Sequence, residues 1–131
     1  VEIDADIVGG TMAGTDPRAL AAEFGETRRL RPEGERPVWH CSLSLPVGDE
    51  IDAGRWSVVA DDFMASMGLD SHQWVAVRHG DTDHDHVHII GTRIGADGTL
   101  WHGQWEARKA ITATQELEKR HGLTLTAGLD D

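Results

Sequence analysis

The chain has 131 residues, enough for one hydrophobic core and therefore for one domain. It carries 23 acidic residues against 12 basic ones, a formal net charge of −11, which excludes a protein that holds nucleic acid by overall positive charge. A nucleic-acid binder of this charge would need a divalent metal and a local basic patch. No stretch has the length and apolarity of a membrane span, and the one cysteine, Cys41, cannot form an internal disulfide. We therefore expect a cytoplasmic protein with no membrane partner.

The first third of the chain predicts an extended or irregular segment followed by a helix. Residues 1–15 contain three glycines that interrupt any periodicity. Asp16 and Pro17 are a strong helix start, an N-cap followed by proline in the first turn, and the helix should end before Pro32. Its inward stripe is expected to hold Leu20, Ala21 and Phe24. Four arginines near its end either contact a polyanion or form a solvated helix end: Arg28, Arg29, Arg31 and Arg36.

The middle of the chain predicts a half-buried strand and an amphipathic helix. Residues 37–45 alternate between apolar and polar side chains, so the strand should bury Trp39, Cys41, Leu43 and Leu45. His40, on the polar face, is either a surface histidine or a group that supports a reactive face. Residues 52–67 have helical spacing and Gly68 should end that helix; its core stripe is Trp56, Val59, Phe63 and Met67.

The second half of the chain predicts paired strands and a long helix. Residues 73–79 and 86–94 should pair, and residues 99–101 can return as a short strand after a turn. Residues 105–121 form a helix, and the tail after Leu125 is expected to fray. The inward side of this helix is expected to hold Ala107, Ala110, Ile111, Thr114 and Leu117. Strands and helices lack a regular βαβ rhythm, which predicts an α+β fold, an antiparallel β-sheet with helices packed on it.

The most informative stretch is histidine-rich and ends in apolar residues that favour a strand. Alternate residues of a strand share a face, so His86 and His88 should project together, roughly 7 Å apart at the backbone. His79 ends the preceding strand and can supply a third ligand if the two strands pair. Histidine is a usual ligand of Zn, Mn and related ions, so the spacing predicts a divalent metal site.

The order His79-x-Asp81-x-Asp83-His84-x-His86-Val87-His88 resembles the third motif of conjugative relaxases, mobilisation endonucleases of the HUH (His-hydrophobic-His) superfamily. The resemblance to the mobilisation-protein branch runs from about residue 9 to about residue 126. It implies an HUH relaxase-like sheet and an enzyme that nicks one DNA strand at a plasmid transfer origin. By resemblance, a tyrosine attacks the scissile phosphate and stays attached to the 5′ end.

The resemblance also implies roles for individual residues. His79, His86 and His88 would hold one divalent ion (Mg, Mn or Zn), Asp81 would support the site, and His84 occupies a position at which the family often has a histidine. The DNA-contacting candidates are Arg28, Arg29, Arg31 and His40. The implied partners are single-stranded DNA at the transfer origin and relaxosome accessory proteins.

The chain departs from the family pattern because it contains no tyrosine. Either residues 1–131 are a relaxase domain that lacks its N-terminal strand and tyrosine segment, or the protein is not a complete nickase. In relatives the missing strand is usually central to the sheet, so the first alternative implies that something else fills its place.

Two other interpretations stay open at this point. A histidine-triad nucleotide hydrolase would place a covalent nucleophile at His86, although Asp85 stands where that motif needs an apolar residue. A non-catalytic, metal-stabilised DNA-binding module would use the histidines for folding alone.

Overall fold

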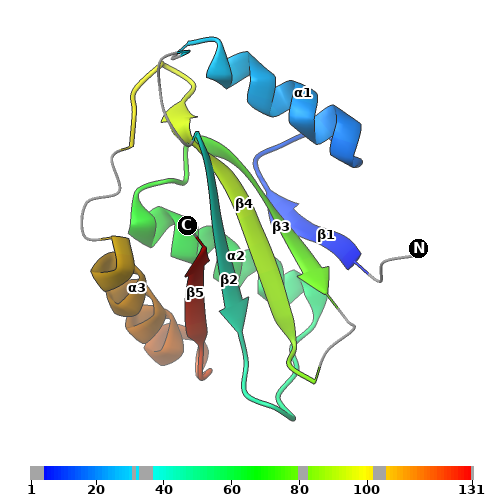
Figure 1. Ribbon diagram of the computed structural model, residues 1–131. Coiled ribbons are helices and arrows are strands. Elements are labelled where there is room, and N and C mark those ends of the chain that lie inside the picture. Colours follow the sequence, from blue (N-terminus) through cyan, green and yellow to red (C-terminus); the bar gives the residue numbers. More distant parts are fainter. Residues whose placement is uncertain (1–4, 31, 33–36, 80–82, 102–105, 131) are drawn as a thin grey trace.

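The computed structural model describes residues 5–30, 32, 37–79, 83–101 and 106–130. Five strands form a single antiparallel sheet, and three helices accompany it (Figure 1). The α+β prediction is therefore confirmed. In chain order the elements are β1 (Ala5–Gly10), α1 (Pro17–Arg28), β2 (Val38–Ser44), α2 (Ala53–Met67), β3 (His72–His79), β4 (His86–Gly95), α3 (Glu106–His121) and β5 (Thr126–Asp130).

The sheet has the strand order β1-β3-β4-β2-β5, so the β3–β4 hairpin and β2 occupy its centre. Every neighbouring pair is antiparallel, and β2 pairs with β4 over seven consecutive positions. The described strands leave no gap at the centre of the sheet, since β3, β4 and β2 are directly bonded to one another. The register places Ser42 opposite His88 and His40 opposite Ile90.

The core lies between one face of this sheet and the helices α2 and α3. The predicted alternation of β2 is confirmed, because Trp39, Cys41, Leu43 and Leu45 are all buried. The predicted stripe of α2 is also buried against the sheet: Trp56, Val59, Phe63 and Met67. Both ends of α2 follow from local chemistry. The Asp52 side chain accepts from the backbone N–H of Arg55, and Gly68 ends the helix with a left-handed φ of 79°.

The start of α1 is the predicted one, since the Asp16 carboxylate accepts from the N–H of Ala19 and Pro17 is the first helical residue. This helix lies away from α2 and α3, across the end of the sheet at which β3 begins (Figure 1). The hydroxyl of Thr27 bonds Gln73 at 2.9 Å and anchors the end of the helix there. Thr27 is the one fully buried residue of α1, and Ala21, expected inward, is exposed.

The two edges of the sheet are strands that the sequence did not predict as such. The segment expected to be extended or irregular contains β1, which pairs with β3 across a bulge between Ile7 and Gly9. Gly10 ends β1 with φ 129°, and a Cβ there would collide with the carbonyl oxygen of Trp74. The tail expected to fray is β5, which pairs with β2. Both edge strands are held by backbone hydrogen bonds to a central neighbour, which side-chain alternation does not reveal.

The buried face of α3 also differs in part from the predicted one. Ala110, Thr114 and Leu117 are buried as expected, but Ala107 and Ile111 are exposed and Ala113 is buried instead. Ile111 is 58% exposed. Helix α3 contacts both α2 and β5, and the face of α3 that these contacts cover carries Ala110 and Ala113. The short return strand after β4 is reduced to one bridge between Ile94 and Leu100.

Candidate metal centre

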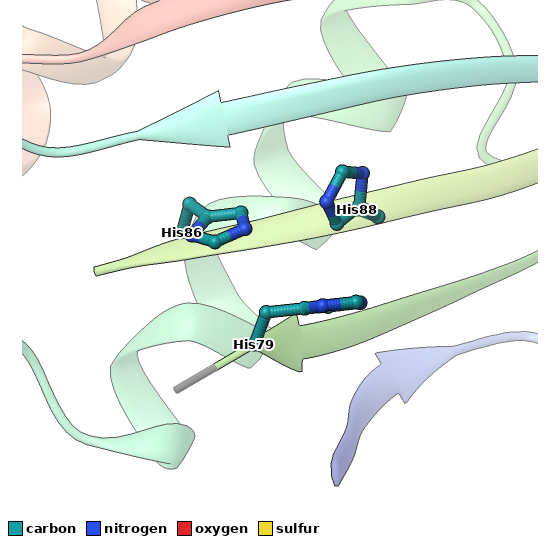
Figure 2. Close-up of side chains that lie close together, drawn as sticks. All are labelled: His79, His86 and His88. Carbon is teal, nitrogen blue, oxygen red and sulfur yellow. The ribbon is translucent and has the colours of Figure 1, made fainter. Parts of the chain in front are cut away.

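The β3–β4 hairpin brings the three predicted histidines together (Figure 2). His79 and His86 are directly opposite in the antiparallel register, and His88 follows two residues along the same face of β4. The side chains of Val87 and Ile89 point to the other face and are fully buried in the core. The packing of these two residues therefore fixes the face on which the histidines project, the one opposite α2 and α3.

One ring nitrogen from each of His79, His86 and His88 lies within 4.8 Å of the others. The ring centroids of the three pairs are 4.5 to 5.4 Å apart, and each side chain is half-buried. A tetrahedral ion with ligand nitrogens at about 2.1 Å separates them by about 3.4 Å, so small side-chain rotations would close the set around an ion. Neutral imidazoles are suitable ligands for Zn and related divalent ions, and three of them leave coordination positions open. The donor set thus fits a divalent metal.

Two of these histidines have one ring nitrogen already engaged. His86 Nδ1 lies 3.0 Å from the carbonyl oxygen of His84. A carbonyl can only accept, so Nδ1 of His86 carries the proton and Nε2 has a lone pair for a metal. His88 Nδ1 lies 2.9 Å from Nε2 of His40, a neighbour on β2. Which of these two nitrogens carries the proton depends on the tautomers of the two rings.

An ion pair on the opposite face of the hairpin supports the site and was missed by sequence reasoning. Arg78 Nε lies 3.0 Å from Asp85 Oδ1, and Arg78 Nη2 lies 3.1 Å from Asp85 Oδ2. The backbone N–H of Ile51 donates to Asp85 Oδ2 at 3.0 Å, and Arg78 donates to the Ile51 carbonyl at 2.9 Å. The pair therefore joins β3, β4 and the loop before α2. Position in the sequence could have indicated this ion pair. Arg78 directly precedes His79 and Asp85 directly precedes His86, and these two histidines are opposite each other in the sheet.

A pocket of about 490 Å³ opens beside the histidines, at the end of β2 and the start of β4. Its wall combines hydroxyl and imidazole groups with two apolar side chains: Ser44, Leu45, Pro46, His84, His86 and Thr126. His84 itself is exposed. The pocket adjoins the metal ligands through His86, so a group bound there would lie next to the ion.

Two of the predicted DNA-contacting residues, Arg28 and Arg29, lie away from the histidines. Arg28 and Arg29 follow Thr27, which is bonded to Gln73, six residues along β3 from His79. At 3.3 Å per strand residue, this places the end of α1 about 20 Å from His79. Two further predicted positions, Asp81 and Arg31, lie outside the described residues, as does Arg36.

Comparison with known families agrees with this arrangement. The model of the family "Relaxase: MobA/VirD2-like, nuclease domain" matches residues 2–123. Two curated relatives from Escherichia coli, each named Protein TraI, are 28% identical over 114 residues and 24% identical over 115 residues. These alignments cover 86% and 87% of this chain but only 15% of each relative. No solved structure gives a significant match.

The chain belongs to the MobA/VirD2-like relaxase nuclease family. This membership supports a relaxase-type DNA nickase and decides against the histidine-triad hydrolase. The chain spans about 15% of the length of the curated relatives that it matches. In the part of the chain that the structure describes, no helix has the length and apolarity needed to cross a membrane.

Proposed function

We propose that this chain is the metal-binding part of a relaxase that nicks one strand of plasmid DNA at its transfer origin. The observation that carries the proposal is the convergence of His79, His86 and His88 on the open face of the sheet, in a chain of the relaxase nuclease family. The substrate is single-stranded DNA, and relaxosome accessory proteins are the expected protein partners.

In this proposal the three imidazoles hold one divalent ion, Mg, Mn or Zn. When bound, the ion supplies positive charge that stabilises the developing charge on a phosphoryl oxygen. The protein's own contribution is orientation. The His84 carbonyl holds His86 in the tautomer that is protonated on Nδ1, and the Arg78–Asp85 pair holds the two strands that carry the ligands.

The pocket beside His86 is suited to the DNA flanking the scissile phosphate. Ser44 and Thr126 offer hydroxyl groups to phosphate or sugar oxygens, and Leu45 and Pro46 offer an apolar wall. His84, exposed at the rim, is assigned a catalytic role in proton exchange with the reacting groups. Asp81 is assigned either the same proton exchange or a hydrogen bond that orients a ligand imidazole.

The nucleophile in this proposal is a tyrosine outside these 131 residues, since the sequence contains none. Its oxygen forms a bond to phosphorus as the bond from phosphorus to the 3′ oxygen breaks. The tyrosine gives up its proton and the 3′ oxygen gains one, so the products are a 5′-phosphotyrosine and a free 3′-hydroxyl. Because a phosphodiester is exchanged for another, the step is reversible and permits rejoining.

A nicking assay tests the proposal. An end-labelled single-stranded transfer-origin oligonucleotide is incubated with Mg or Mn and this chain, with and without the tyrosine-bearing segment encoded upstream. We expect no covalent adduct from the 131 residues alone, and both nicking and rejoining when the segment is fused or added. A protein-linked band from this chain alone would identify another nucleophile. Metal and DNA binding without activity under any arrangement would favour the non-catalytic module.

A further inference from the structure

His40 contacts a proposed metal ligand although it lies on a different strand. It is on β2, opposite Ile90, while His88 is opposite Ser42, so the two histidines are diagonal neighbours on one face of the sheet. Nε2 of His40 and Nδ1 of His88 are 2.9 Å apart, a hydrogen-bond distance. The ring planes are only 20° apart, which suits a bond between groups that lie in the plane of each ring.

We infer that His40 is a positioning residue that selects the metal-binding tautomer and orientation of His88. This inference rests on the proposed function, because it assumes that His88 binds a metal. If His40 donated its Nε2 proton, Nδ1 of His88 would be the acceptor and the His88 proton would sit on Nε2, blocking metal binding. If His88 donates from Nδ1, its Nε2 is unprotonated, which is the form that binds a metal. A metal on Nε2 therefore requires His40 to act as the acceptor.

The arrangement at His86 supports this assignment. Its Nδ1 donates to the carbonyl of His84, which fixes the same tautomer that metal binding requires of His88. The two ligands on β4 thus use the same ring nitrogen for support and the same one for the ion. The support for His86 is the backbone carbonyl of His84, in the segment before β4. The support for His88 is the His40 side chain on β2. Through His40, the position of the central strand β2 affects the orientation of His88.

Mn affinity, measured by electron paramagnetic resonance of free Mn in the absence of DNA, tests the role of His40. We expect His40→Ala to weaken binding about 10-fold or more, the loss typical of removing a group that supports a ligand histidine. His40→Gln, which can place an acceptor oxygen near the position of Nε2, should stay close to wild type. Ser42→Ala is the matched control, because it alters the same face directly opposite His88. Circular dichroism confirms that each variant is folded.

A second measurement needs no variant. In the Zn-loaded wild-type protein, two-bond proton–nitrogen correlations of the imidazoles should show His88 protonated on Nδ1 and bound through Nε2. Metal attached to Nδ1 of His88 would overturn the inference, and so would equal Mn affinity of wild type and His40→Ala. If the wild-type protein itself bound no metal, the metal centre of the proposed function would fail as well. A loss of DNA affinity without any change in Mn affinity would assign His40 to DNA contact instead.

Discussion

The ion pair between Arg78 and Asp85 should contribute measurably to both stability and metal binding. The side chain of Asp85 is only 8% exposed and that of Arg78 is 24% exposed. The Asp85 carboxylate accepts from the Arg78 guanidinium and from the backbone N–H of Ile51. In Asp85→Asn the amide nitrogen must face one of these donors, whichever way the side chain is turned. The variant therefore loses both the charge and one acceptor.

The expected loss can be bounded from the structure. Removing one partner of a fully buried pair costs about 3–5 kcal/mol, and a single hydrogen bond to a charged group contributes about 1.5–3 kcal/mol. Because Arg78 is partly exposed, solvent screens the charge that is left, and we expect about 2–3 kcal/mol for Asp85→Asn. For a domain of this size that corresponds to a decrease in Tm of roughly 5–10 °C.

Urea and thermal unfolding of the metal-free protein measure this loss. Asp83→Asn is the matched control, since Asp83 is two residues away, exposed and changed in the same way. The double variant with Arg78→Met should lose less than the sum of the single variants, because removing both charges leaves neither unpaired. A Tm for Asp85→Asn within 1–2 °C of the Asp83→Asn value would refute the reasoning. Mn affinity should also fall, since the pair holds the strands that carry the ligands.

Three further outcomes are expected. The double change His86→Ala, His88→Ala should abolish binding of stoichiometric metal, and metal retained by this variant would contradict the ligand assignment. In the wild-type protein, metal binding should weaken at acid pH, because a protonated imidazole cannot bind a metal. If Arg28 and Arg29 contact the DNA backbone, neutralising them should weaken DNA binding evenly across sequences and flatten the salt dependence of that binding. An unchanged salt slope would identify these arginines as a solvated helix end. Asp61 is exposed, but partial desolvation and the neighbouring Asp62 carboxylate raise its pKa, so its charged form lowers stability as pH rises through that pKa. Asp61→Asn should therefore raise Tm at pH 7 but not at pH 3, and an equal effect at both would exclude charge as the cause.

Much of the central fold follows from local patterns. Alternation along β2 identified its buried face, and helical spacing with a C-terminal Gly68 identified α2. The alternation of His86 and His88 with Val87 identified the open face of β4. These features are determined within a few residues, since the period of the side chains and the capping groups are local properties of the chain.

The rotation of α3 and the two edge strands required the tertiary structure. Ile111 has the correct spacing for the core, yet it is exposed because close contact between α2 and α3 selects the face that carries Ala113. β5 has little side-chain alternation, and it is a strand because the open edge of β2 offers it backbone partners. In both cases the decisive partner lies elsewhere in the chain.

By itself, the sequence determined which residues form the histidine cluster, because His79, His86 and His88 lie on one hairpin whose pairing is local. Only the tertiary structure decided what holds them. His40 and His88 are 48 residues apart, and their contact depends on the register of β2 against β4. The Arg78–Asp85 pair likewise reaches Ile51, a residue of a different loop. The spacing of the three histidines in the sequence identifies them as candidate ligands. Their orientation arises from contacts between segments that only the folded sheet brings together.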